Sequence, residues 1–210
     1  MIITEISECK KNKNRVNVYV DGDFAFALYL ETAMQYGLKK DQDISGLDFK
    51  TIAEDDEKKY SMDAAFKFIS YQMRCKNEVF KKLKQKGVSD ESAGETIRKL
   101  EELGYINDRV YAETYAAELK ERMGNRGIMR KLFEKGIDKD IAEEVLQGMG
   151  EYTILAAFQA EKLFEKYKDL DKRKAREKVF RTLMSRGFET DDIRRAINKY
   201  GEKEDGYEGI

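Results

Sequence analysis

Apolar residues recur along most of the chain with the spacing of half-buried helices, and one such pattern occurs three times. Each residue of a helix turns by about 100°, so Val79, Phe80 and Leu83 share one face of the first copy. The later copies have apolar residues at the same positions, namely Ile128, Met129, Leu132, Val179, Phe180 and Leu183. Each copy ends in a basic residue followed by glycine, and the three glycines are 49 and then 51 residues apart. A period of this length indicates an array of stacked helical units.

Each glycine predicts the end of one helix and the start of the next. Gly87, Gly136 and Gly187 can adopt the left-handed conformation that ends a helix, and Ser89 and Asp138 can cap the helices that follow. A third helix is therefore expected over about residues 90–103, 139–148 and 190–199. A first helix is expected before each copy, over residues 62–73, 108–122 and 152–167. The chain is thus predicted to contain three tandem three-helix units.

The first 60 residues follow a different pattern. The segments ITEI, RVNVYV and FAFALYL alternate as strands, and the Asp21-Gly22 pair predicts a hairpin turn between the second and third. The link CKKNKN is basic, and we interpret it as a solvated hairpin loop rather than a mobile binding tip. From Glu31 the helical period returns in ETAMQYGLKK and again in DFKTIAEDDEKKY. The prediction is a mainly α protein in which a small β-meander plus helix extension precedes three three-helix repeats that form a curved array.

The pattern divides the chain into five expected segments. Residues 1–60 form the β-rich extension with a helix, and residues 201–210 form an acidic tail that we expect to be disordered. The three repeats between them cover residues 61–107, 108–150 and 151–200.

Composition narrows the classes of function. Histidine is absent, which excludes an imidazole base, a Ser-His or Cys-His nucleophile and a His-ligated metal. The two cysteines, Cys9 and Cys75, fit no metal or redox spacing, and their scarcity suits a reduced cytosol. No apolar run reaches the roughly 20 residues that span a membrane, and the N-terminus lacks a secretory pattern. We expect a cytoplasmic monomer without cofactors or membrane contact.

Two clusters resemble sites but have simpler interpretations. The acids Glu54, Asp55, Asp56 and Glu57 suggest a metal or acid–base site, yet a solvated helix face is favoured because nothing nearby completes such a site. Between the first two repeats, the sequence predicts a helix end, an apolar plug of Tyr105 and Ile106, a helix cap at Asn107 or Asp108, and two tyrosines on one face. We interpret this corner as packing between units rather than a ligand site; its residues are Gly104, Tyr105, Ile106, Asn107, Asp108, Tyr111 and Tyr115.

The net charge of −1 conceals a separation of charge along the chain. Residues 74–86 contain six basic side chains and one acid, residues 122–135 five and one, and residues 172–186 seven and one. Lys81, Arg130 and Arg181 share one repeat position, opposite the apolar face, and should point outward. A row of such residues suits a polyanion or an acidic protein surface. A merely solvated face is the alternative, and the threefold repetition favours a binding surface.

These residues resemble the RecX family of regulatory proteins. The resemblance lies in RCKNEVFKKLKQKG of the first repeat, in LEELGYIND with Tyr111 and Ala112, and in IMRKLFEKGI of the second repeat. It covers about residues 61–200, and the β-rich extension resembles that of RecX proteins from Gram-positive bacteria. At Cys75 the family often has serine, which is a better helix cap, so a looser helix end is expected there.

The resemblance implies a non-enzymatic modulator of the RecA recombinase that binds in the groove of the RecA filament on single-stranded DNA. Such a protein limits filament growth, ATP hydrolysis, strand exchange and coprotease activity, and contacts DNA weakly or within the filament. The residues expected to bind the filament are Arg74, Lys76, Lys81, Lys82, Arg122, Arg126, Arg130, Lys131, Arg173, Lys174, Arg176 and Arg181. The residues expected to form the structural motif are Gly87, Gly104, Tyr105, Ile106, Asn107, Asp108, Tyr111, Tyr115, Gly136 and Gly187.

Two other functions are compatible with parts of the sequence. Three-helix units with a basic second helix can act as a DNA-binding module independently of RecA, although a net charge near zero argues against strong binding to naked DNA. A metal-dependent nuclease would need clustered carboxylates, but the acids lie at helix starts, where capping explains them. The chain also lacks a glycine-rich phosphate loop with a lysine.

Overall fold

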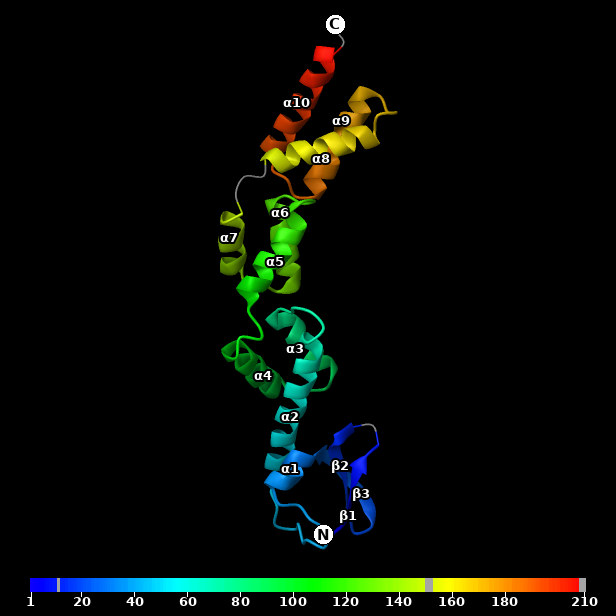
Figure 1. Cartoon of the computed structure of the whole chain (residues 1–210), viewed down its shortest axis with the longest axis vertical. Coiled ribbons are helices and arrows are strands. Elements are labelled where there is room, and N and C mark those ends of the chain that lie inside the picture. The colour runs from blue at the N-terminus through cyan, green and yellow to red at the C-terminus, as the bar shows by residue number, and fades with distance from the viewer. Residues whose placement is uncertain (11, 150–152, 208–210) are drawn as a thin grey trace. The chain divides into compact units, whose positions relative to one another are not determined.

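The computed structural model describes residues 1–10, 12–149 and 153–207, and these form two compact units (Figure 1). Unit 1 consists of Met1–Arg74 and Glu78–Ile106, and unit 2 consists of Cys75–Asn77 and Asn107–Ile210. Unit 1 contains the N-terminal sheet and the first three-helix domain, and unit 2 contains the second and third three-helix domains. The predicted mainly α fold with a small N-terminal sheet is confirmed.

The sheet is an antiparallel meander of β1 (Ile3–Cys9), β2 (Asn12–Val20) and β3 (Asp23–Tyr29). The predicted turn is present: Asp21 and Gly22 have φ values of 51° and 97°, which favour this kind of hairpin turn. The solvated loop expected at CKKNKN is wrong over most of its length, because β1 includes Cys9 and β2 begins at Asn12. Lys11 lies outside the described residues.

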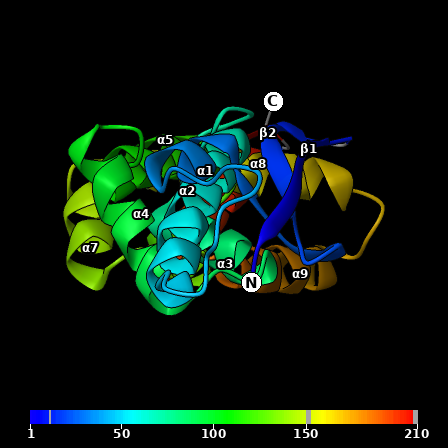
Figure 2. The same cartoon turned by 90° about the horizontal axis from the view of Figure 1, so that it is seen from below.

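Helix α1 (Leu30–Gln35) follows the sheet, and α2 (Phe49–Ile69) connects the sheet to the first three-helix domain (Figures 1 and 2). The sequence predicts two separate helices in the region of α2, and this is wrong. No glycine or proline occurs between Phe49 and Ile69, so nothing interrupts the helix. The N-terminal half of α2 contributes Ile52 to the core beneath the sheet, and the C-terminal half contributes Ala65 to the core of the first three-helix domain.

The three-helix domains follow the predicted order. After α2, the helices are α3 (Lys76–Gln85), α4 (Asp90–Glu102), α5 (Asp108–Lys120), α6 (Asn125–Lys135), α7 (Lys139–Gln147), α8 (Thr153–Lys166), α9 (Lys172–Ser185) and α10 (Thr190–Tyr207). Ser89 and Asp138 cap α4 and α7 through their side chains, as predicted, and of the two expected candidates for α5 it is Asn107 rather than Asp108 that caps the helix.

Helix α10 extends seven residues into the segment that we expected to be a disordered tail, so that expectation is wrong for residues 201–207. Continuing an existing helix costs far less than starting one, which offsets the low helix propensity of Gly201 and Gly206 in this segment. Residues 208–210 lie outside the described part of the chain.

The repeated apolar pattern forms the cores of the three-helix domains. Its outer positions, Val79 and Leu83 with their equivalents in the other two repeats, are 0% exposed. The middle position, occupied by Phe80, Met129 and Phe180, is only partly buried and packs at the edge of each core. The repeat therefore leaves one apolar residue per domain within reach of the surface.

The corner between the first two repeats is packed, with one exception. Ile106 is buried, and Tyr111 lies in the core of the second three-helix domain with its ring 5.8 Å from that of Tyr115. Tyr105 is 59% exposed rather than part of an apolar plug, and its ring lies perpendicular to that of Phe66 with 5.0 Å between the ring centres. Within unit 2, Cys75 is buried, and the backbone N–H of Lys76 donates a 2.8 Å hydrogen bond to the Asp108 carboxylate, so an acceptor is present at the start of α3 although Cys75 is a poor cap.

The second and third three-helix domains meet through glycines within unit 2. The backbone N–H groups of Gly124 and Arg126 donate to the carbonyls of Arg186 and Gly187 over 3.1 and 3.2 Å. A Cβ at Gly127 would lie 2.1 Å from the Arg186 oxygen, and one at Gly187 would lie 2.0 Å from the Gly127 nitrogen. The start of α6 and the end of α9 thus approach more closely than any side chain permits.

Candidate interaction surfaces

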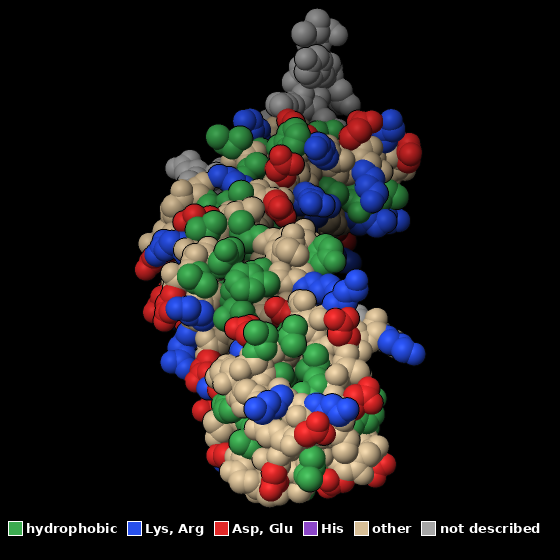
Figure 3. All heavy atoms as spheres, turned by 60° about the horizontal axis from the view of Figure 1, so that its bottom comes forward, with side chains coloured by type: hydrophobic (Ala, Val, Ile, Leu, Met, Phe, Trp, Pro, Cys, Tyr) green, Lys and Arg blue, Asp and Glu red, His purple; other side chains and the backbone are tan. Residues whose placement is uncertain are grey.

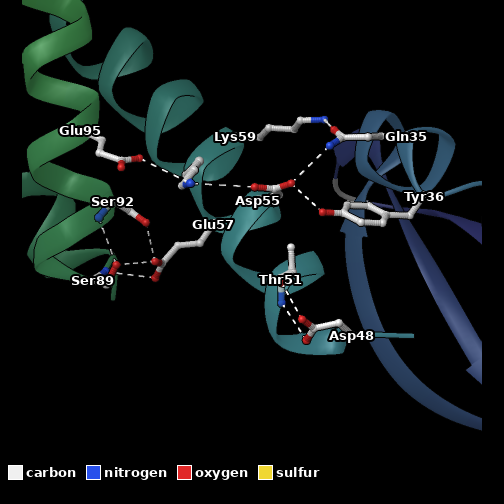
Figure 4. Close-up of polar contacts among 11 residues, drawn as sticks. Gln35, Tyr36, Asp48, Thr51, Asp55, Glu57, Lys59, Ser89, Ser92 and Glu95 are labelled. Carbon is white, nitrogen blue, oxygen red and sulfur yellow. Dashed lines mark hydrogen bonds and ion pairs between the residues drawn. The ribbon is translucent and has the colours of Figure 1, made fainter. Parts of the chain in front are cut away.

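Most of the acidic run on α2 is a structural joint, so the predicted solvated helix face holds for Glu54 but is wrong for Asp55, Asp56 and Glu57 (Figure 4). Asp56 is buried and accepts hydrogen bonds from the Tyr29 backbone at 2.6 Å and from the Thr32 hydroxyl at 3.0 Å, and it pairs with Arg15 at 3.2 Å. Asp55 accepts a 2.7 Å hydrogen bond from the Tyr36 hydroxyl. These carboxylates connect α2 to the sheet and to α1.

Glu57 turns to the other side of α2 and joins it to α4 (Figure 4). Its carboxylate accepts hydrogen bonds from the Ser89 backbone at 3.0 Å and from the Ser92 hydroxyl at 2.7 Å. Partial burial raises the pKa of Glu57, but the hydrogen bonds from Ser89 and Ser92 outweigh it and hold the pKa below its ordinary value. Within the described ranges, no group of three or more acidic or cysteine side chains is arranged to hold a metal ion.

The repeated basic position is exposed in every domain. Lys81, Arg130 and Arg181 each lie on the exposed side of their helix, opposite the buried apolar positions. On the face shown in Figure 3, lysine and arginine side chains alternate with acidic ones, and hydrophobic side chains are exposed among them. Acidic side chains also lie beside two of the repeated cations, since Glu134 pairs with Arg130 and Glu177 with Arg181.

Several of the predicted binding cations form ion pairs within their own domain or unit. Arg126 pairs with Glu189 at 2.7 Å, Lys131 with Glu134 at 2.6 Å and Arg181 with Glu177 at 3.4 Å. Exposed pairs of this kind contribute at most about 1 kcal/mol, so an anionic partner can displace them. Glu177 also pairs with Arg173, and Glu134 with Arg130.

Four of the predicted cations form no ion pair among the residues that the structure describes: Lys81, Arg122, Lys174 and Arg176. Two others have packing roles in unit 1. The Arg74 guanidinium lies 4.3 Å from the Phe68 ring centre and pairs with Glu78, and the Lys82 ammonium lies 5.6 Å from the same ring. Lys76 is partly buried in unit 2. The first four cations can therefore contact a partner without breaking an ion pair, whereas the paired ones must first exchange a glutamate for the partner.

Unit 1 also contains a polar and aromatic pocket that the sequence did not predict. It has a volume of about 600 Å³, and its lining includes Tyr29, Tyr60, Tyr71, Lys67 and Lys86. Burial and a hydrogen bond with Asp63 raise the pKa of Tyr29 to about 12, so its hydroxyl stays protonated. The sequence signal for this pocket is the spacing of Tyr60, Lys67 and Tyr71, which places them on one face of α2 and its continuation. This shared face would have been visible if the sequence had been interpreted as one long helix rather than two.

The unit 2 grooves lie beside the basic positions. One is formed by α6 and α7 and has a volume of about 490 Å³, and another is formed by α9 and α10 and has a volume of about 390 Å³. Arg130 lines the first and Arg181 lines the second.

None of the helices in the described residues is long and apolar enough to cross a membrane.

Comparison with known proteins agrees with this architecture. Four family models match the chain: the regulatory protein RecX N-terminal domain over residues 1–45, and the first, second and third three-helix domains of RecX over residues 62–100, 107–146 and 151–197.

Curated relatives match over nearly the whole chain. The chain is 33% identical to regulatory protein RecX of Bacillus subtilis, covering 94% of this chain and 76% of the relative. It is likewise 33% identical to that of Clostridium tetani, covering 94% of this chain and 93% of the relative.

Solved structures match as well. A crystal structure of regulatory protein RecX has a TM-score of 0.67 at 28% identity, covering 92% of this chain and 98% of the other. The crystal structure of RecX from Lactobacillus salivarius has a TM-score of 0.62 at 32% identity, covering 69% of this chain and 96% of the other. The order of the domains, the repeated helix ends and these matches together show that the chain belongs to the RecX family of regulatory proteins.

Proposed function

We propose that this protein is a negative regulator of the RecA recombinase that binds in the groove of the RecA filament on single-stranded DNA. In this role it limits filament growth, ATP hydrolysis, strand exchange and coprotease activity, acts as a monomer and needs no cofactor. The observation that carries the proposal is the exposed cation at one position of every repeat, Lys81, Arg130 and Arg181, on the opposite side of the helix from the buried apolar positions. Membership of the RecX family supports the choice of partner.

A filament is a suitable partner for a repeated surface. Each weak contact adds to the others when the sites are linked in one chain, because the second binding event becomes intramolecular. A nucleoprotein filament presents both phosphates and acidic side chains, and a basic surface interrupted by acids is suited to such a mixed partner rather than to bare DNA. Affinity should accordingly fall as salt rises.

Co-sedimentation with RecA filaments assembled on single-stranded DNA tests the proposed surface. The test variant replaces six exposed cations with alanine: Lys81, Arg126, Arg130, Arg173, Arg176 and Arg181. A control with the same change of charge replaces six exposed lysines outside the second helices: Lys39, Lys40, Lys50, Lys99, Lys139 and Lys168. We expect the first variant to stay in the supernatant because it no longer binds the filaments, and the control variant to sediment with them. If both variants sediment like the original protein, the surface assignment is wrong.

The pocket of unit 1 favours one alternative, a DNA-binding module that acts independently of RecA. Its tyrosines can stack on bases and its lysines can contact phosphates, and Tyr71 is 77% exposed. Fluorescence anisotropy with a labelled single-stranded oligonucleotide tests this function. Tight binding that weakens steeply with salt, and that is lost in Tyr71→Ala with Lys67→Ala, would support the alternative. Weak binding at moderate salt, unchanged in that variant, would exclude it.

A further inference from the structure

The two grooves of unit 2 are built from the same repeat positions. Met129 and Leu146 line the groove of the second three-helix domain, and Phe180 and Ile197 line that of the third. Each pair of equivalents is 51 residues apart, which is the distance between the helix-ending glycines Gly136 and Gly187. The grooves are therefore a feature of the repeat, produced where the partly buried middle position of the second helix meets the third helix.

The lining of each groove contains more arginines than acids, although Arg126, Arg130 and Arg181 also form exposed ion pairs with glutamates. Arg126 and Arg130 line the first groove beside Glu143. Arg176, Arg181 and Arg194 line the second beside Glu177. Arg130 and Arg181 are equivalent and exposed, so each groove combines an apolar floor with an arginine at the same place on its rim. This combination suits an apolar side chain that is flanked by acidic residues.

We propose that each groove binds an apolar side chain of an acidic protein segment, and that the pair binds the same segment on two subunits of a repeating assembly. This inference rests on the proposed function, in which that assembly is the RecA filament. Two similar sites in one compact unit suit a partner that presents one element repeatedly, and a filament does so. Their volumes of about 490 and 390 Å³ lie in the range that accommodates inserted side chains and small ligands.

The floors favour protein over nucleic acid as the occupant. Met129 and Leu146 are flexible or aliphatic and adapt to an apolar side chain, whereas bases stack on flat aromatic rings. Each lining contains a single aromatic ring, Phe133 in the first groove and Phe180 in the second, and its other apolar residues are Met129, Leu146 and Ile197. The first repeat has Phe80, Lys81 and Ile97 at the equivalent positions, so its chemistry is similar.

Filling each groove with a large side chain tests the proposal. Gln147 and Asn198 are equivalent, exposed and part of the two linings, so Gln147→Trp and Asn198→Trp should occupy the grooves from the rim without altering the cores. Lys199→Trp is the matched control, since Lys199 is exposed next to Asn198 but does not line the groove. The assay measures the affinity of each variant for RecA filaments held on single-stranded DNA by a non-hydrolysable ATP analogue, and for the naked DNA.

We expect each groove-filling substitution to weaken filament binding about tenfold, and the double variant about a hundredfold, because distant sites contribute independently. Lys199→Trp should bind like the original protein, and no variant should change the affinity for naked DNA. Filament binding by the double variant within twofold of the original would overturn the proposal while leaving the proposed function intact. A parallel loss of DNA affinity would overturn it in favour of a nucleic-acid groove. If the original protein itself fails to bind filaments, the proposed function fails, and the grooves have no repeated partner in RecA.

Discussion

The two units hold their parts together by opposite means. In unit 1, α2 joins the sheet to the first three-helix domain through carboxylates, with Asp56 facing the sheet and Glu57 facing α4. In unit 2, the second and third three-helix domains meet backbone to backbone, where Gly124, Gly127 and Gly187 leave no room for a side chain. The first joint depends on charge and hydrogen bonds, and the second depends on shape.

The difference determines how each joint can fail. A joint of hydrogen-bonded carboxylates weakens when one group is removed or protonated, because the remaining donors lose their acceptor. The stability of a joint made by close backbone approach does not depend on pH, but adding a methyl group there forces a helix to move. Substitutions at the two joints should therefore differ in both size and pH dependence.

The largest effect is expected at Gly127. In an exposed helix, replacing glycine with alanine stabilises by about 1 kcal/mol, but Gly127→Ala places a methyl group against the Arg186 carbonyl oxygen. We expect the free energy of unfolding to fall by about 3 kcal/mol. Gly94→Ala in α4 is the control, since nothing lies within 4 Å of the added Cβ, and it should raise stability. Urea unfolding followed by circular dichroism measures both. Equal effects of the two substitutions would refute the steric joint.

A smaller loss is expected at Asp56. Asp56→Ala removes the acceptor of the buried Tyr29 N–H and Thr32 hydroxyl and leaves Arg15 without its partner. Unsatisfied buried groups of this kind cost about 2 kcal/mol. Glu54→Ala, two residues earlier and exposed, should change stability by less than about 0.5 kcal/mol. If thermal unfolding does not distinguish the two, the acidic run is a solvated face after all.

The smallest effect is a pH dependence at Glu57. Because its pKa is lower in the folded protein, Glu57 stabilises unit 1 fully above its ordinary pKa of 4.5, and this contribution is lost as the pH falls through the lower folded value. Glu57→Gln should reduce stability at neutral pH and flatten the loss of stability on acidification. Unfolding curves recorded from neutral to acid pH measure this slope. Identical slopes for the variant and the original protein would show that Glu57 does not contribute.

The sequence predicted the parts of the structure that depend on local pattern. The buried positions of the repeat and the caps Ser89, Asn107 and Asp138 follow from periodicity and residue type, and both were confirmed. Asp56 was misread because its partners, Arg15 and Tyr29, are far away in the sequence. A helical pattern shows which side chains share a face of the helix, but it does not show which of them distant parts of the chain will bury.

The grooves and the glycine joint escaped prediction for related reasons. Met129 and Phe180 match the apolar pattern as well as any core residue, and only the packing of the third helix leaves them near the surface. Gly124 and Gly127 have no glycine counterparts in the other repeats, so the period gave no reason to single them out. Sites that arise between helices need the packing as well as the pattern.

The central claim, that this RecX-family protein regulates RecA, is tested most directly by the single-stranded-DNA-dependent ATPase rate of the cognate RecA. The rate is measured while this protein is added from far below one copy per RecA subunit up to equimolar amounts, with folding confirmed by circular dichroism. We predict a pronounced fall in rate well below one copy per subunit, because one molecule bound to a filament affects many subunits. An unchanged rate at equimolar amounts of folded protein would contradict the claim.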